Sequence, residues 1–228
     1  MQQYFTDRKL NINETISLDD EVLYHLIKVL RKDSSYTFRL ADKDGDIYHC
    51  HLVNSKECIV TDKFDENNEL DCDITCILSL FKNDKFELCL QKLTELGVKR
   101  FVPYQSVRSV VKARDEKKVQ RMRKIVREAA EQSHRNIIPE ICDVASIRDL
   151  SRYLSEKNYI CYESSRNIVD VDTGRSLTYI IGPEGGFENR EYETICGMGF
   201  EPISLGKRIL RAETAAIYMT SIIVGKCQ

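Results

Sequence analysis

The chain has 228 residues, of which 42% are apolar and 31% charged, and its formal net charge is −2. That length suits one large or two modest domains with a buried core. No apolar run approaches the roughly 20 residues of a membrane helix, and the first residues show no basic stretch followed by an apolar one. We therefore expect a cytoplasmic protein without a membrane segment or secretory signal.

The nine cysteines are scattered singly along the chain, and several lie in apolar, strand-like runs. This pattern favours reduced, buried thiols over a disulfide framework. His49-Cys50-His51 looks like a fragment of a metal site, but in a strand Cys50 faces away from the two histidines. No second cluster accompanies it, so we predict no bound metal.

Charge is unevenly distributed. Residues 1–70 hold 9 Lys and Arg against 14 Asp and Glu, whereas residues 82–135 hold 15 against 7. A basic segment in a nearly neutral protein is typical of a surface that faces phosphates, although a solvated helix face would look the same.

Residues 1–70 predict a small β-rich unit. Strand-like segments occupy 4–5, 36–40, 47–53 and 58–61. Residues 42–46 carry a strong hairpin signal. Ser17 can N-cap a helix whose apolar stripe runs over 22–30. Short strands around one helix suggest a small barrel, and the polar stretch 62–69 is the best candidate for a linker.

From residue 73 the pattern changes to strands that alternate with helices. The expected strands are 73–80, 100–103, 139–144, 159–162, 177–181 and 202–205. The expected helices are 84–96, 113–134, 146–154, 189–197 and 213–224. This order predicts an α/β fold with a mostly parallel sheet covered on both faces. Such sheets bind ligands where their strands end.

Two glycine-containing loops follow two of these strands. The first is Gly182-Pro183-Glu184-Gly185-Gly186, and the second is 204–210. Glycine lets backbone come close to a ligand and leaves N–H groups pointing outward. The same glycines could serve only to make turns, so the local pattern leaves both interpretations open.

Further motifs span almost the whole chain. They are His25-x3-Val29-Leu30-Arg31, Gln91-Lys92-Leu93-Thr94-Glu95-Leu96-Gly97-Val98, Arg108-Ser109-Val110-Val111-Lys112, Glu128-Ala129-Ala130-Glu131-Gln132-Ser133-x-Arg135 with Pro139-Glu140, and the two loops, the second continuing to Ala215. Together they resemble the SPOUT-class methyltransferases that methylate N3 of a uridine in small-subunit ribosomal RNA, close to the decoding site. The two loops in this order are the most specific part of the resemblance.

The resemblance implies a PUA-like, RNA-binding β-barrel in residues 1–70 and a SPOUT domain with a trefoil knot in residues 71–228. It also implies S-adenosylmethionine as the cofactor, and a homodimer whose site is completed across the interface. The expected partner is small-subunit ribosomal RNA or the assembled small subunit. Gln3, Ser34-Ser35 and Val107 depart from the family pattern and bear on RNA docking, not on the cofactor loops.

The cofactor is expected to bind to residues of the two loops. The predicted set is Ile181, Gly182, Glu184, Gly185, Gly186, Ser204, Leu205, Gly206, Ile209 and Leu210. The apolar members would enclose the adenine, although Ile181 and Ile209 could equally be packing residues. Glu184 is either a turn residue or a carboxylate of the site.

Two residues are candidates for catalysis, and five for RNA contacts. Arg211 could stabilise negative charge on a uracil carbonyl oxygen. Glu213 could accept the N3 proton, or merely cap the final helix. The predicted RNA-binding residues are Arg31, Arg108, Lys112, Gln132 and Arg135. Gln132 could instead cap the neighbouring loop.

Two other functions stay open at this point. One is a different SPOUT reaction, such as ribose 2′-O or pseudouridine methylation. The other is a ribosome-assembly factor that binds RNA without catalysis. A phosphate-binding ATPase is disfavoured, because no GxxxxGK[ST] motif occurs in the chain.

Overall fold

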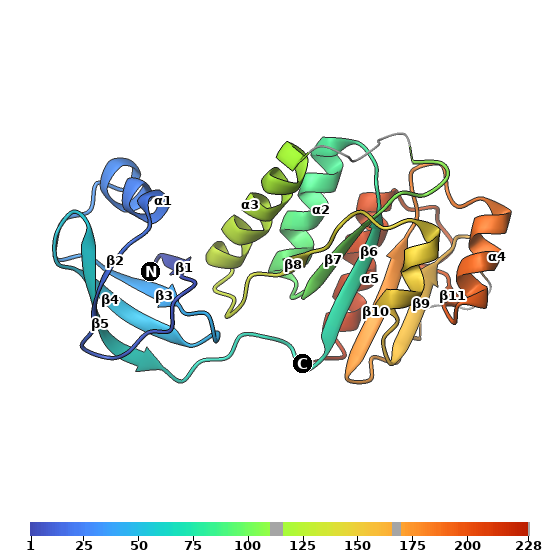
Figure 1. Ribbon diagram of the computed structural model, residues 1–228. Coiled ribbons are helices and arrows are strands. Elements are labelled where there is room, and N and C mark those ends of the chain that lie inside the picture. Colours follow the sequence, from blue (N-terminus) through green and yellow to red (C-terminus); the bar gives the residue numbers. More distant parts are fainter. Residues whose placement is uncertain (110–115, 166–169, 228) are drawn as a thin grey trace. The chain divides into compact units, whose positions relative to one another are not determined.

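The computed structural model describes residues 1–109, 116–165 and 170–227 (Figure 1). The chain divides into two compact units, one formed by residues 1–69 with 130–138 and the other by 70–129 with 139–228. The predicted division at residue 70 puts 130–138 in the second domain, whereas the structure groups this segment with the first unit.

The first unit is built on a five-stranded mixed sheet that curls into a half-barrel. Its elements are β1 (Gln3–Phe5), β2 (Thr15–Ser17), α1 (Asp20–Leu23), the π-helical segment η1 (Tyr24–Val29), β3 (Thr37–Ala41), β4 (Ile47–Leu52) and β5 (Glu57–Phe64). The strand order is β1-β3-β4-β5-β2, and all neighbours are antiparallel except β1 and β3. The predicted β-rich unit with one helix is therefore confirmed.

The helix of this unit packs its apolar stripe into the core, with Leu26 fully buried. Its N-cap is Asp19 and not Ser17, because Ser17 pairs with Glu57 as the last residue of β2. His25 lies close to the buried Tyr4, whose hydroxyl is 2.7 Å from the His25 Nδ1. The histidine of the first motif thus ties the helix to the edge strand β1.

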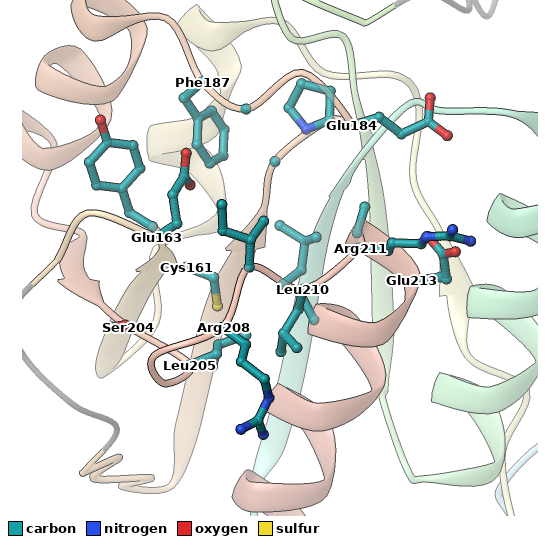
Figure 2. Close-up of a pocket in the computed structure, with 18 of the residues that line it drawn as sticks. Cys161, Glu163, Glu184, Phe187, Ser204, Leu205, Arg208, Leu210, Arg211 and Glu213 are labelled. Carbon is teal, nitrogen blue, oxygen red and sulfur yellow. The ribbon is translucent and has the colours of Figure 1, made fainter.

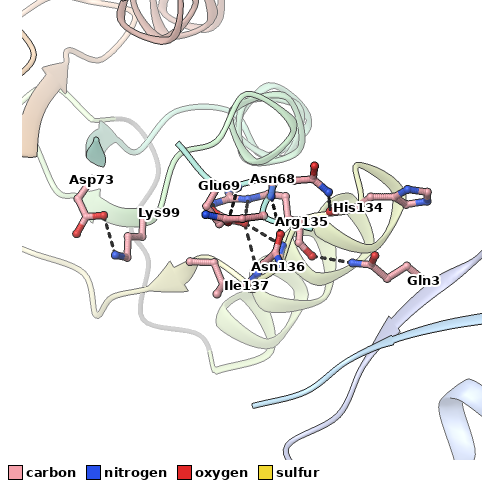
Figure 3. Close-up of polar contacts among 10 residues, drawn as sticks. Gln3, Asn68, Glu69, Asp73, Lys99, His134, Arg135, Asn136 and Ile137 are labelled. Atoms are coloured by element: carbon pink, nitrogen blue, oxygen red, sulfur yellow. Dashed lines mark hydrogen bonds and ion pairs between the residues drawn. The ribbon is translucent and has the colours of Figure 1, made fainter. Parts of the chain in front are cut away.

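A polar network explains why residues 130–138 fold with the first unit (Figure 3). The Arg135 side chain is only 3% exposed and forms an ion pair with Glu69. The same carboxylate accepts a hydrogen bond from the Asn136 backbone N–H at 3.0 Å. The buried Gln3 side chain donates to the Arg135 carbonyl at 2.6 Å, and Asn136 Nδ2 donates to the Gly45 carbonyl at 2.8 Å. Residues 130–138 therefore belong to the first unit because of their side-chain contacts with it, although they are distant from it in the sequence.

The second unit is a six-stranded sheet in which every pairing is parallel. Its elements are β6 (Asp73–Ser79), α2 (Asn83–Glu95), β7 (Arg100–Tyr104), α3 (Glu116–Gln132, whose end belongs to the first unit), β8 (Glu140–Ile141), the 3-10 helix η2 (Ile147–Tyr153), β9 (Lys157–Cys161), β10 (Ser176–Ile181), α4 (Asn189–Gly197), β11 (Glu201–Ile203) and α5 (Ala212–Val224). The strand order is β11-β9-β10-β6-β7-β8. The predicted α/β architecture is confirmed, while the knot stays a prediction.

Helices cover both faces of this sheet, as the alternation of side chains along β10 shows. Tyr179 is fully buried and its hydroxyl lies 2.6 Å from the Thr220 hydroxyl of α5. The next residue, Ile180, packs in the opposite core with Leu150 of η2 and Ile195 of α4. Because β9, β10 and β11 are neighbours and parallel, the loops that follow them leave from one edge.

Among the described helices, none is long and apolar enough to cross a membrane. The described residues also contain no group of three or more His, Cys, Asp or Glu that could hold a metal ion. His49 instead packs edge-on against the Phe64 ring, and His51 Nδ1 lies 2.9 Å from the Thr37 hydroxyl. All nine cysteines are free thiols.

Candidate functional site

A cavity of about 470 Å³ lies where β9, β10 and β11 end (Figure 2). It is lined by Lys85, Cys161, Tyr162, Glu163, Ile181, Gly182, Pro183, Glu184, Gly186, Phe187, Ser204, Leu205, Gly206, Arg208, Ile209, Leu210, Arg211, Ala212, Glu213 and Ala215. Both glycine-containing loops therefore line the same cavity, which favours a ligand site over two plain turns. Of the ten predicted cofactor residues, Gly185 alone does not line the cavity.

The first loop needs glycine for a reason that the sequence did not reveal. A Cβ added to Gly182 would lie 2.8 Å from Cε2 of Phe187, so the missing side chain makes room for that ring. Phe187 is 5% exposed and packs into the core beside α4. The turn itself is closed by a hydrogen bond from Gly186 N–H to the Pro183 carbonyl at 2.9 Å. Glycine at 182 thus shapes the loop by internal packing.

The second loop is more open. Gly206 has φ +114°, a backbone conformation that side-chain-bearing residues rarely adopt, and nothing lies within 4 Å of an added Cβ. Ser204 is buried, and its hydroxyl lies 3.4 Å from the Gly206 nitrogen. Ile209 is 86% exposed and therefore is not a core residue, whereas Ile181 is 1% exposed and does belong to the core. A core-packing role, which the sequence left open for both isoleucines, is therefore supported for Ile181 and not for Ile209.

One ammonium group stands between two carboxylates at the rim of the cavity. Lys85 Nζ, from the first turn of α2, lies 3.3 Å from Glu213 Oε1 and 3.6 Å from Glu184 Oε1. The other Glu213 oxygen, Oε2, is buried and has no hydrogen-bond partner among the described residues. Figure 2 shows Arg211 and Glu213 on the same turn at the start of α5. A buried acceptor without a partner is costly, so this oxygen is suited to a ligand or substrate donor.

One cysteine lines the cavity and another, Cys89, lies in α2 near its rim, and both have a raised thiol pKa. Burial raises the pKa of Cys161, which lines the cavity, to about 12. Burial, with a smaller contribution from the charge of Glu213, also raises the pKa of Cys89 in α2 to about 12. A thiolate is the nucleophilic form of cysteine. These side chains therefore act as apolar lining and packing groups, not as nucleophiles.

Sequence reasoning missed several lining residues outside the two predicted loops. They are Lys85, Cys161, Tyr162, Glu163, Phe187, Ala212 and Ala215. Pro183 and Arg208 belong to those loops and also line the cavity. The parallel-sheet rule could have found Cys161 to Glu163, because the strand expected at 159–162 ends at the same edge as the two loops. Lys85 carries no such signal, since a lysine in the first turn of a helix is ordinary. Only the packing of α2 beside α5 reveals its position.

The predicted RNA-binding residues are distributed over both units. Arg31 and Gln132 are exposed in the first unit, and Arg31 holds φ 52° at the end of the helical segment. Arg108 is exposed in the second unit, where its Nη1 donates to the Gly185 carbonyl at 3.0 Å. Lys112 lies outside the described residues. The buried ion pair of Arg135 with Glu69 does not support its predicted RNA contact, because the guanidinium is enclosed by protein.

The cavity suits a ligand that combines an apolar body with polar and cationic groups. Its volume falls within the range of small-molecule sites, roughly 300 to 1,000 Å³. Apolar side chains such as Ile181, Leu205 and Leu210 line one part of it, while three carboxylates and three cations lie on its walls. Together with the unpartnered Glu213 oxygen, this donor and acceptor set fits S-adenosylmethionine, which carries an adenine ring, hydroxyl groups and positive charge.

Comparison with known proteins agrees with this site. Residues 68–224 match the RNA methyltransferase domain family. The chain is 36% identical to ribosomal RNA small subunit methyltransferase E of Bacillus subtilis, over 98% of this chain and 96% of that protein.

Two solved structures are also similar to it. One is a ribosomal RNA small subunit methyltransferase E from Neisseria gonorrhoeae bound to S-adenosyl methionine, at 27% identity and TM-score 0.92, with 99% of this chain and 98% of that chain covered. The other, from Legionella pneumophila with the bound cofactor S-adenosylmethionine, has 27% identity and TM-score 0.93, over 98% and 97% of the two chains. On these matches, the chain belongs to the ribosomal RNA small subunit methyltransferase E family, within the RNA methyltransferases.

Proposed function

We propose that this protein uses S-adenosylmethionine to methylate N3 of a specific uridine in small-subunit ribosomal RNA, near the decoding site. The observation that carries the proposal is that both loops line the same cavity, with Arg211 and the unpartnered Glu213 oxygen at its rim. Family membership supports the cofactor and the RNA class. The choice of N3 rests on the motif resemblance and on the chemistry of these two side chains.

The cofactor would be held by the loop residues 181–186 and 204–210, with Leu205 and Leu210 beside its adenine. When bound, S-adenosylmethionine supplies an electrophilic methyl group on its sulfonium. The protein has two further tasks, because the N3 nitrogen carries a proton that must leave as the N–CH₃ bond forms. Glu213 Oε2 is the acceptor for that proton, and the Arg211 guanidinium stabilises the negative charge that develops on a uracil carbonyl oxygen.

RNA binding is assigned to exposed cations of both units. Arg31 in the PUA-like first unit and Arg108 beside the cofactor loop would contact phosphates, which position RNA without reading its sequence. Gln132, exposed at the end of α3, could meet a base edge. Since the substrate is a ribosomal component, the protein works in the cytoplasm.

We also propose a homodimer. The helix α5 is apolar along most of its length, yet Tyr218 is 47% exposed on it and Ile209, just before it, is 86% exposed. Exposed apolar side chains next to a ligand cavity are typical of a surface that another chain covers. A second copy would thereby complete the site from outside.

Nucleoside mass spectrometry of ribosomal RNA tests the reaction. Ribosomal RNA from a strain that lacks the gene should lack N3-methyluridine at one site near the decoding centre. The purified protein with S-adenosylmethionine should restore this nucleoside. Separate reactions on extracted ribosomal RNA and on small subunits, both from that strain, show which of the two is the substrate.

The alternatives predict different results. A ribose 2′-O-methylated nucleoside or a methylated pseudouridine in the product would assign another SPOUT reaction. Unchanged N3-methyluridine in the deletion strain would overturn the proposal. An assembly factor would bind RNA with no calorimetric signal for S-adenosylmethionine.

A further inference from the structure

A buried carboxylate outside the cavity joins the Arg108 loop to the start of α4. Glu191 is the third residue of α4 and is 3% exposed. Its Oε1 accepts hydrogen bonds from the Tyr104 hydroxyl at 2.5 Å and the Val107 N–H at 3.1 Å. Its Oε2 accepts from the Ser106 hydroxyl at 3.1 Å and the Glu188 N–H at 3.2 Å. Three of these four donors belong to residues 104–107, where β7 ends and a loop begins.

The arrangement uses both carboxylate oxygens of Glu191 as acceptors. Burying a charge is unfavourable unless hydrogen bonds replace water, and four donors do so here. Burial, and then the hydrogen bond to Glu191, raise the pKa of Tyr104, so its phenol stays protonated and donates. A glutamine at 191 would replace one acceptor oxygen by an NH₂ group, which is a donor. In one orientation this group would face the Ser106 and Glu188 donors, and in the other it would face the Tyr104 and Val107 donors. Glutamic acid is thus suited to this position for its two acceptor oxygens.

The two segments that Glu191 connects both lead to the proposed site. Arg108 follows Val107 directly, and its Nη1 donates to the Gly185 carbonyl at 3.0 Å. Gly185 belongs to the loop whose neighbours Glu184 and Gly186 line the cavity, and that loop runs through Phe187 into α4. The Glu191 carboxylate therefore fixes the Arg108 loop relative to the cofactor loop.

We propose that Glu191 is a positioning residue that holds the RNA-contacting Arg108 in register with the methyl-donor loop. This inference rests on the proposed function. It assigns a role to a side chain that touches neither the cavity nor the exposed RNA-facing surface. A displacement of about 1 Å between reacting groups is enough to lower a rate by about 100-fold.

The test compares Glu191→Gln with Glu193→Gln. Glu193 is exposed on the same helix, so its substitution changes the charge equally without touching the loop. Hydrogen exchange at the Val107 amide should become about tenfold faster in E191Q, because one hydrogen bond is lost or weakened. E191Q should keep the calorimetric affinity for S-adenosylmethionine within about threefold, while kcat/KM for a small-subunit ribosomal RNA fragment falls about 10- to 100-fold. E193Q should match the wild type throughout.

A mutant cycle with Arg108→Ala separates positioning from general stabilisation. If Glu191 acts through Arg108, the two substitutions together should weaken RNA affinity no more than R108A alone. Fully additive losses, or E191Q behaving like E193Q in Val107 exchange and in kcat/KM, would overturn the inference. If E191Q does not fold, Tyr104→Phe removes one donor and leaves three, and the same measurements apply. Wild-type inactivity on ribosomal RNA would refute the proposed function alone, because Val107 exchange and RNA affinity are read without catalysis.

Discussion

Lys85 and Glu213 come from different helices and meet at the rim of the cavity, with Nζ 3.3 Å from Oε1. Glu184, on the first loop, lies 3.6 Å from the same ammonium. One cation therefore balances two carboxylates that would otherwise repel each other, and it ties α2 to both walls of the site. The charge of Glu213 also reaches the buried Cys89, one turn further along α2.

Replacing Lys85 should disturb the site more than the fold. In Lys85→Met, Glu213 keeps a largely buried charge without its counterion, so the free energy of unfolding should fall by about 1 kcal/mol. The kcat should fall about 10-fold or more as the two carboxylates move apart. Urea unfolding and steady-state methylation measure these effects. Exposed Lys82→Met is the matched control, and adding Glu213→Gln should restore part of the lost stability. Equal stability of K85M and K82M would contradict a role of Lys85 in balancing the charge of Glu184 and Glu213.

Substitutions of Arg211 and of Glu213 should affect kcat and stability differently. Arg211→Ala should lower kcat by about 100- to 1,000-fold with little change in S-adenosylmethionine affinity, because it acts on charge that develops during the reaction. Glu213→Gln should lower kcat by about 100-fold or more if Glu213 accepts the proton. If Glu213 only caps α5, E213Q should lose stability and keep its kcat. Single-turnover kinetics distinguish these results, with Arg148→Ala, exposed on η2 and outside the cavity, as the control for R211A.

Arg135 should contribute to the stability of the fold and not to RNA binding. Arg135→Ala leaves Glu69 enclosed without its partner, so the free energy of unfolding should fall by about 3 kcal/mol. Arg123→Ala, on the exposed face of α3, should change it by less than about 0.5 kcal/mol. Urea titrations give both values. A fully stable R135A that binds ribosomal RNA weakly would restore the RNA contact predicted from the sequence.

The exposed apolar residues predict the oligomeric state. Wild-type protein should elute with the mass of a dimer in light scattering, and Tyr218→Asp combined with Ile209→Asp should shift it to a monomer. A buried charge at an interface costs several kcal/mol, which explains the expected shift. Glu193→Lys on α4 is the control and should stay dimeric. A monomeric wild type would contradict the proposed dimer directly.

Stability should decline in alkaline solution because of Tyr104. Burial and Glu191 raise its pKa above the ordinary 10.0 in the folded state only. Above pH 10 the unfolded chain loses a proton that the folded chain keeps, so the free energy of unfolding falls as pH rises, by about 1.4 kcal/mol per pH unit for one such group. Tyr104→Phe should make this decline shallower between pH 10 and 11. Exposed Tyr218→Phe serves as the control, and identical slopes for Y104F and wild type would refute the argument.

The sequence by itself determined the order of elements in the second unit and the edge where its site lies. Alternating strand and helix patterns depend on side-chain periodicity, which is local, and the carboxyl ends of parallel strands must share an edge. Which residues of that edge face a ligand came from the resemblance of the two loops to the methyltransferase family, and nine of the ten residues predicted in this way line the cavity. The catalytic candidates Arg211 and Glu213, which follow the second loop directly, also line it.

The tertiary structure decided what depends on partners far apart in the chain. The pairing of Glu69 with Arg135 draws residues 130–138 into the first unit, 66 residues from the carboxylate in sequence. The packing of α2 beside α5 brings Lys85 between Glu184 and Glu213. Glu191 meets Tyr104 across 87 residues. Periodicity reports which face of an element is buried, but only the folded chain determines which polar group each buried charge meets.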